Sequence, residues 1–370
     1  MYGLKKIPLR GDWDMDEKIY IFGAHSRAQT LAVYLQALYP EMKIEAFLYN
    51  NEEKNPKKIG GIPVLFLDEG KLCTEFPIYI GTRGIYHKDL TERLRNVGFE
   101  KIYPVTVELD LRIRNEYLKK YFADSGEEFA KIENLENAGK DPSAVVYVAR
   151  SAYDRPLKAP YEPVFYEKEI QAGTVLTAER LAEGILTDAG GDNISDRNRQ
   201  FCELTALYWI WKNAREDIVG LAHYRRHFIL PEDWKERMLC NQVDVILPVP
   251  LYVAPDLEEN YKARHEASDW EYMMECVKEQ DMRMYRQAAE FFKGNLYSPC
   301  NMLIARREVL DELCVWLFPI LFKVAEHGGQ KEDGYQNRYP GFLSERLITF
   351  FFHMNKGRFK VVYADKNFLQ

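Results

Sequence analysis

The chain has 370 residues, enough for two domains, and 46% of them are hydrophobic, so each half can bury a full core. Its formal net charge of -7 lacks the basic bias of proteins that bind duplex nucleic acid, so no nucleic-acid partner is expected. The six cysteines are scattered without a Cys-x-x-Cys pair, which is typical of reduced cytoplasmic thiols. Neither a signal peptide nor a membrane-spanning stretch is expected, so we predict a cytoplasmic protein, at most peripheral to the inner face of the membrane.

The first part of the chain alternates between strands and helices over residues 16–122, after a loose leader at residues 1–15. Strands are predicted for residues 18–25, 44–51, 59–69, 76–82 and 101–106, and helices for residues 26–40 and 88–100. This alternation predicts an α/β domain with a parallel, Rossmann-like sheet. The polar, acidic stretch at residues 123–142 predicts a helical or flexible linker.

The α/β pattern restarts in a second domain over residues 143–370. Strands are predicted for residues 145–151, 217–228, 243–250 and 359–365, and helices for residues 203–214, 256–293 and 340–355. Residues 298–327 read as a strand that runs into a long apolar helix. We therefore expect two α/β domains joined by the linker.

A glycine turn at Phe22–Gln29 lies at a strand–helix junction of the kind that binds phosphate with backbone N–H groups. Only Gly23 of the dinucleotide-binding glycine pattern is present. Asn50 and Asn51 stand where an acidic residue would bind the ribose. We expect a Rossmann-like fold without a dinucleotide, and no cofactor is assigned.

The segment Gly220–Phe228 is an apolar strand that ends in two adjacent arginines, Arg225 and Arg226. Ligands of open α/β sheets bind beyond the carboxyl ends of strands, and two guanidinium groups suit a diphosphate. His223 and Tyr224 precede the arginines and are candidate substrate-binding residues. The alternative is an ordinary solvated basic turn.

The loop Gly190–Asn198 offers Asp192 and Asn193 as ligands for the hydroxyl groups of a sugar or a ribose. The alternative is a helix start, with Ser195 or Asp196 as N-cap. The residues alone favour neither.

Two further polar residues lie at element starts. Glu345, in the segment Gly341–Leu347, is a candidate general base, and its alternative role is to stabilise a helix dipole. Asn301, in the segment Asn295–Ile304, is a candidate sugar ligand, and its alternative role is to cap a turn.

Several separated segments of residues 143–370 carry a resemblance to a known family. They are, in chain order, DNIS, CELTALYWIWKN, GLAHYRRHF, DVILP, NMLIARREVLDELCVWLF and PGFLSERL. They resemble bacterial glycosyltransferases of capsular and exopolysaccharide synthesis, whose hallmark is the HYRR segment and whose domain was previously of unknown function. The resemblance implies a GT-A-like fold, a nucleotide-sugar donor, most simply a UDP-sugar, and a glycan or lipid-linked acceptor. The first 122 residues are similar to Rossmann-like domains found beside sugar-modifying enzymes.

With this resemblance, the donor nucleotide is expected at the strand end around Arg150 and at the loop of Asp192 and Asn193. Arg225 and Arg226 would then neutralise the leaving diphosphate. Two alternatives stay open, an NAD-linked sugar oxidoreductase and a non-catalytic scaffold that binds nucleotide-sugars.

The segment departs from ordinary GT-A enzymes, which place an Asp-x-Asp for Mn²⁺ or Mg²⁺ where this sequence has His223–Arg226. Glu108-Leu109-Asp110 imitates that motif but lies in the first domain. His223 and His227 are four residues apart, yet their segment reads as extended rather than helical, so a zinc pair is not expected. A divalent metal therefore has no evident site.

Overall fold

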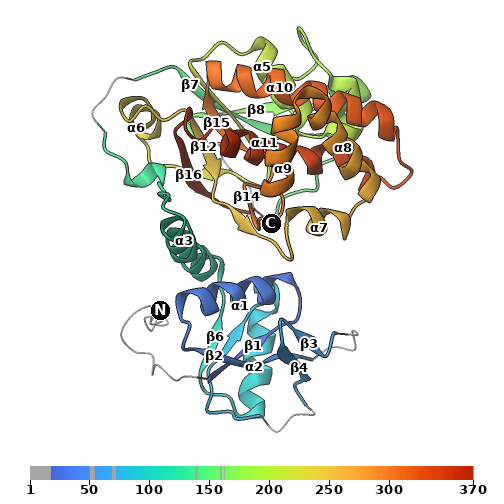
Figure 1. Ribbon diagram of the computed structural model, residues 1–370. Coiled ribbons are helices and arrows are strands. Elements are labelled where there is room, and N and C mark those ends of the chain that lie inside the picture. Colours follow the sequence, from blue (N-terminus) through green and yellow to red (C-terminus); the bar gives the residue numbers. More distant parts are fainter. Residues whose placement is uncertain are drawn as a thin grey trace. The chain divides into compact units, whose positions relative to one another are not determined.

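The computed structural model describes residues 18–50, 55–68, 72–137, 141–158, 161 and 163–369. The chain divides into two compact units, Met1–Phe129 and Ala130–Gln370 (Figure 1). Both units combine strands with helices, which confirms the predicted α/β class. The predicted leader at residues 1–15 lies outside the described residues.

The first unit holds, within its described residues, a six-stranded sheet in the order β3-β4-β2-β1-β5-β6. Every pairing in it is parallel except that of β3 with β4. Its strands are β1 (Lys18–Phe22), β2 (Lys43–Tyr49), β3 (Lys58–Ile59), β4 (Ile62–Phe66), β5 (Ile78–Ile80) and β6 (Ile102–Pro104). Its helices are α1 (Ser26–Leu38), α2 (His87–Val97) and α3 (Val107–Asp124), with a 3₁₀ turn η1 at Gly84–Tyr86.

Helix α3 was not predicted from the sequence. Its N-cap Thr106 accepts a hydrogen bond from the backbone N–H of Leu109 at 3.2 Å, and Glu108 and Asp110 lie in its first turn. These are ordinary helix-start signals. Its apolar face packs on α1, where the rings of Tyr34 and Tyr117 lie 4.6 Å apart.

The second unit holds, within its described residues, an eight-stranded mixed sheet in the order β11-β16-β12-β15-β10-β7-β8-β9. Its strands are β7 (Ala144–Arg150), β8 (Glu167–Gln171), β9 (Leu186–Thr187), β10 (Ile218–His223), β11 (Phe228–Ile229), β12 (Val245–Pro248), β15 (Leu303–Arg306) and β16 (Val361–Lys366), and β13 (Leu251–Tyr252) pairs separately with β14 (Leu296–Tyr297). Its helices are α4 (Asn198–Phe201), α5 (Leu204–Asn213), α6 (Trp234–Cys240), α7 (Leu257–Lys262), α8 (Ala267–Gln280), α9 (Met282–Phe291), α10 (Arg307–Gly328) and α11 (Tyr339–Met354). The 3₁₀ turns of this unit are η2 (Ile132–Asn134), η3 (Thr174–Leu176), η4 (Ser195–Arg197) and η5 (Gln336–Arg338).

One edge of this sheet gathers the ends of several strands. β7 and β10 are parallel neighbours, and β15 runs antiparallel between β10 and β12. β16 is parallel to β12. The carboxyl ends of β7, β10, β12 and β16 therefore meet at the edge where β15 begins, which is where α/β sheets bind ligands.

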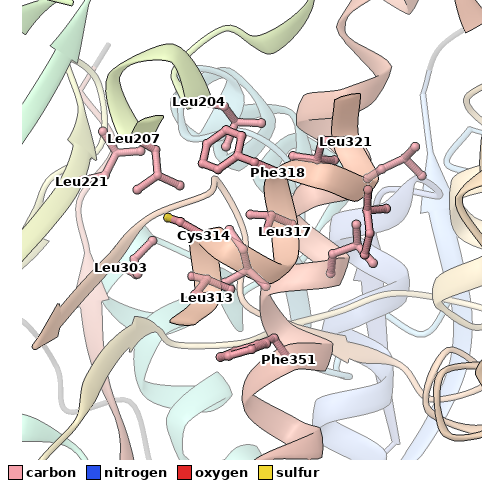
Figure 2. Packing of buried hydrophobic residues seen from close by; sticks show 14 of the residues in the cluster. Leu204, Leu207, Leu221, Leu303, Leu313, Cys314, Leu317, Phe318, Leu321 and Phe351 are labelled. Atoms are coloured by element: carbon pink, nitrogen blue, oxygen red, sulfur yellow. The ribbon is translucent and has the colours of Figure 1, made fainter. Parts of the chain in front are cut away.

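Two apolar cores hold this sheet between helices. One core combines α5, α10 and α11 with the strands, and Figure 2 shows residues such as Leu207, Leu303 and Phe318 packed together there. The other core packs α6 on the opposite face. Among the described helices, none has the length and apolar character that a bilayer span requires.

The predicted linker, residues 123–142, straddles the division between the units. Its first residues are the end of α3, and Ile132 of η2 is fully buried in the core that contains α6. Lys131 forms an ion pair with Asp365 at 2.6 Å. The predicted limits of the two domains stay predictions, but the residues after Ala130 pack as part of the second unit.

Candidate functional site

The His-Tyr-Arg-Arg segment forms a tight turn at the carboxyl end of β10. The backbone N–H groups of His223 and Arg226 each donate to the carbonyl oxygen of the other residue at 3.0 Å. His227, 2% exposed, has Nδ1 2.8 Å from Oε1 of Glu167. The predicted strand at residues 217–228 is therefore interrupted, because this anchored turn separates β10 from β11.

The two arginines of this turn are half-buried and lack acidic partners. No carboxylate of a described residue forms an ion pair with Arg225 or Arg226, and Nε of Arg225 is buried without a hydrogen-bond partner. Both guanidinium groups lie over the ring of Phe368, with Cζ 5.4 Å and 5.3 Å from its centroid. Within the described part of the protein neither guanidinium group forms an ion pair, although the charges of Asp154 and Arg225, and of Glu345 and Arg226, interact at longer range.

Two glutamates form a carboxylate wall near this turn. Glu203 directly precedes α5, and its Oε1 lies 3.8 Å from Nε2 of His223. Glu345, on α11, accepts a hydrogen bond from the backbone N–H of Cys300 at 2.6 Å, and Arg346 lies 3.4 Å away. The Glu203 and Glu345 side chains are 13% and 16% exposed. Glu203 was not predicted as a site residue, because a single acidic residue at a helix start is an ordinary dipole-stabilising feature.

Burial shifts the pKa of Glu345 and that of His223. It raises the pKa of Glu345, and the charge of Glu203 acts in the same direction, while Arg346 and the Cys300 N–H oppose the shift. It also lowers the pKa of His223, against the opposing charge of Glu203. Burial thus disfavours the charged form of both the Glu345 carboxyl group and the His223 imidazole.

A strained turn before β15 joins the two glutamates. Cys300 and Asn301 have φ angles of 77° and 52°, in the left-handed region that non-glycine residues rarely adopt. The Asn301 amide donates to Glu203 at 2.7 Å and to the carbonyl oxygen of Gly341 at 3.0 Å, and its Oδ1 accepts from Ser344 at 2.5 Å. Asn301 is 3% exposed, so its contacts hold the wall together. Its role as a sugar ligand stays a prediction.

Asp154 is a further carboxylate that sequence reasoning missed. It lies in the turn after β7 and accepts a hydrogen bond from the backbone N–H of Ser151 at 2.7 Å. Burial raises its pKa to about 6, although that N–H and the charges of Arg150, Arg225 and Arg338 oppose the shift. These interactions place a readily protonated carboxyl group among the arginines.

Two more predicted substrate-binding residues, Arg150 and Tyr224, lie in or beside the arginine turn. Arg150, at the end of β7, forms an ion pair with Glu169 at 2.7 Å. Tyr224 has its backbone N–H bonded to the carbonyl oxygen of Ala149 at 3.1 Å, which ties the arginine turn to β7.

The loop of Asp192 and Asn193 is not joined to the arginine turn by any contact among the described residues. Asp192 accepts from the hydroxyl of Tyr208 at 3.2 Å, in the middle of α5. Asn193 donates to the carbonyl oxygens of Ala189 and Gly191 within its own loop, at 3.0 Å and 2.9 Å. Its predicted role in binding hydroxyl groups stays a prediction.

Among the described residues, the histidines and carboxylates do not form a shared metal site. His223 faces Glu203 while His227 faces Glu167, so the two imidazoles do not converge. Within the residues that the structure describes, no three His, Cys, Asp or Glu side chains lie together as metal ligands would.

Comparison with known proteins places the chain in a family. The apo structure of the bifunctional glycosyltransferase WbbM is similar in fold, with a TM-score of 0.53 and 23% identity over 62% of this chain and 45% of that one. The chain thus spans less than half the length of that protein, and at this identity the likeness shows the fold alone. No curated protein matches the chain. Residues 145–356, more than half of the chain, match the family described as Domain of unknown function (DUF4422). The chain belongs to this DUF4422 family.

Proposed function

We propose that the second unit is a glycosyltransferase of GT-A-like fold that uses a nucleotide-sugar donor, a UDP-sugar. Its acceptor is a glycan or lipid-linked glycan of capsular or exopolysaccharide synthesis, at the cytoplasmic face of the membrane. The observation that carries the proposal is the pair Arg225 and Arg226 at the carboxyl edge of the sheet, where no carboxylate of a described residue forms an ion pair with either of them. The likeness of fold to the glycosyltransferase WbbM supports it.

The chemistry that such a site must supply is stabilisation of a leaving nucleoside diphosphate. The bond between the anomeric carbon and the diphosphate oxygen breaks, and its electron pair leaves on that oxygen. Arg225 and Arg226 stabilise this negative charge through charge-assisted hydrogen bonds. The acceptor hydroxyl oxygen bonds to the anomeric carbon, and Glu345 takes its proton as general base. The raised pKa of Glu345 suits this step.

The residues present do not fit a divalent ion on the diphosphate. Two arginines stand in the turn at which GT-A enzymes carry acidic ligands, and the described part of the chain gathers no three metal-ligating side chains. We therefore propose that Mn²⁺ or Mg²⁺ is not needed for donor binding, and we derive no step through a metal.

The test is to measure donor turnover with a panel of UDP-sugars for Arg225→Ala and Arg226→Ala, each with and without EDTA. Each alanine variant should lose about 10²–10³-fold in rate, as for loss of one preorganised charge-stabilising contact. Lysine should rescue only partly because it lacks the planar fork. The matched control is Arg358→Ala, which removes an exposed arginine paired with Glu312 and should leave turnover unchanged.

Two outcomes would contradict the proposal. If EDTA abolished the activity of the natural protein while both alanine variants stayed active, the arginines would be a mere basic turn and the metal-free reading would be wrong. If UDP-sugars bound without any turnover, the protein would be a binding scaffold rather than an enzyme.

A further inference from the structure

The chain after β16 runs along the arginine turn and is fastened to its backbone. The backbone N–H of Asn367 donates to the carbonyl oxygen of His227 at 3.0 Å, and its side-chain Oδ1 accepts from the His227 N–H at 2.9 Å. The N–H of Leu369 donates to the carbonyl oxygen of Arg225 at 2.8 Å. These bonds bracket Phe368 on both sides, so its backbone is fixed beside the two arginines.

The Phe368 ring is the shared neighbour of both guanidinium groups. Their Cζ atoms lie 5.4 Å and 5.3 Å from its centroid, within the range of cation–π attraction. The residue is 51% exposed, so burial in a core does not account for a phenylalanine at this position.

An aromatic ring can hold two arginines together without reducing their net charge, which an acidic side chain cannot do. Two adjacent guanidinium groups repel each other, and a carboxylate between them would hold them but would also cancel their charge. The negative face of a ring attracts both cations and leaves their net charge intact. The pair then stays preorganised and fully charged for an anion that arrives from solvent.

We infer that Phe368 is a positioning residue that holds Arg225 and Arg226 in place for the diphosphate of the donor. This inference rests on the proposed function, and it adds a residue far along the chain to the donor site. Phe368 acts through the arginines and takes no part in bond making or breaking.

The experiment measures the dissociation constants of inorganic pyrophosphate and of UDP by calorimetry, using the full chain. Phe368→Leu keeps an apolar side chain and removes the ring, and it should weaken both ligands by about 3- to 30-fold, the range of one cation–π contact. Phe368→Tyr should bind within about 2-fold of the natural protein, since it keeps the aromatic face. Phe368→Glu should bind more weakly than Phe368→Leu, because it neutralises the arginines it holds.

Two controls separate positioning from folding. Phe165→Leu removes a ring that is 73% exposed and contacts Tyr166, and it should leave both dissociation constants unchanged. In the background of Arg225→Ala with Arg226→Ala, Phe368→Leu should have no further effect on binding. The thermal unfolding midpoint should be the same for Phe368→Leu and Phe368→Tyr.

The failure of this inference is distinct from failure of the proposed function. If the natural protein binds pyrophosphate and UDP while Phe368→Leu binds them equally well, Phe368 does not position the arginines, and the proposed function stands. If Phe368→Glu binds the two ligands better than Phe368→Leu does, the ring only holds the backbone in place and does not position the arginines for the diphosphate. If the natural protein binds neither ligand, the donor site itself is wrong.

Discussion

Glu345 has two roles open to it in this geometry, and they make different demands on its atoms. A general base needs an ionisable carboxylate, whereas a fastener of the Cys300 turn needs only an oxygen that accepts the Cys300 N–H bond. Glutamine keeps that oxygen and loses the charge, while alanine loses both. The pair of substitutions therefore separates catalysis from architecture at one position.

We predict that Glu345→Gln lowers turnover by about 10²-fold or more while the fold persists, as expected for a lost general base. Because burial raises the folded-state pKa of Glu345, the folded protein loses stability as pH rises through that pKa, and the glutamine variant escapes this loss. Its thermal midpoint at neutral pH should therefore be no lower than that of the natural protein. The rate of the natural protein should rise with pH through the same raised pKa, and the variant should lack this limb.

The matched control is Glu308→Gln, an exposed glutamate in the first turn of α10 that pairs with Arg306, which should leave the rate unchanged and lower the stability by about 1 kcal/mol at most. A Glu345→Gln protein with full turnover, together with an inactive and unstable Glu345→Ala protein, would assign the residue to the architecture alone.

For single residues, the sequence predicted those that stand in a motif but not the residues that contact them in the fold. Arg225 and Arg226 stand out because they are adjacent at the end of an apolar run. Glu203 and Asp154 are single acidic residues that belong to no recognisable sequence motif. They reach the same edge of the sheet only because β7 pairs with β10 and because Glu203, at the start of α5, lies beside His223. Phe368 could not be predicted for the same reason, because its contact with the arginines depends on the pairing of β11 with β16.

The turn before β15 is the element whose strain is easiest to test. Asn301 combines a φ of 52° with hydrogen bonds to two elements, α11 and the start of α5. Alanine would lose the hydrogen bonds and keep the left-handed strain, whereas glycine would lose the hydrogen bonds and relieve the strain. We therefore predict that Asn301→Gly is more stable than Asn301→Ala by about 1 kcal/mol.

The measurement is the free energy of unfolding of the second unit in denaturant. Lys278, in the last turn of α8, provides the control, because there alanine should be more stable than glycine. Equal stability of the two Asn301 variants, with the expected order at Lys278, would mean that the turn relaxes when the side chain is removed.

Among helices and strands, the apolar periodicity of the sequence predicted the elements that bury one apolar face or stripe. The parallel strands of the first unit and helices α5, α10 and α11 follow their apolar patterns, whereas the strand predicted for residues 59–69 divides at Gly60 and Gly61 into the antiparallel pair of β3 and β4. β8 was missed because three of its five residues are charged, and β9 was missed because it has only two residues. The predicted strand at residues 217–228 was too long, because hydrogen bonds between His223 and Arg226 close a turn that no apolar pattern signals.

The chain divides into its two compact units within the stretch that composition predicts as a linker. Residues 123–142 are polar and acidic, which favoured a linker, yet Ile132 is fully buried and Arg237 donates to the carbonyl oxygen of Leu135. Burial tends to lower the pKa of Lys131, but its ion pairs with Asp365 and Glu133 raise it overall. A few apolar and charged residues in a polar stretch are enough to anchor it, and composition averages over them.

We predict that the second unit folds alone when it begins at Ala130 and folds poorly when it begins at Asp141. The shorter fragment lacks Ile132, which occupies the core against α6, and leaves Asp365 without the Lys131 ammonium. Loss of one buried isoleucine side chain alone typically costs about 2–5 kcal/mol, a large share of the stability of a domain. Thermal unfolding of the two fragments is the measurement, and Ile132→Ala in the longer fragment should reproduce most of the difference. Equal midpoints for fragments 130–370 and 141–370 would show that the stretch is a linker after all.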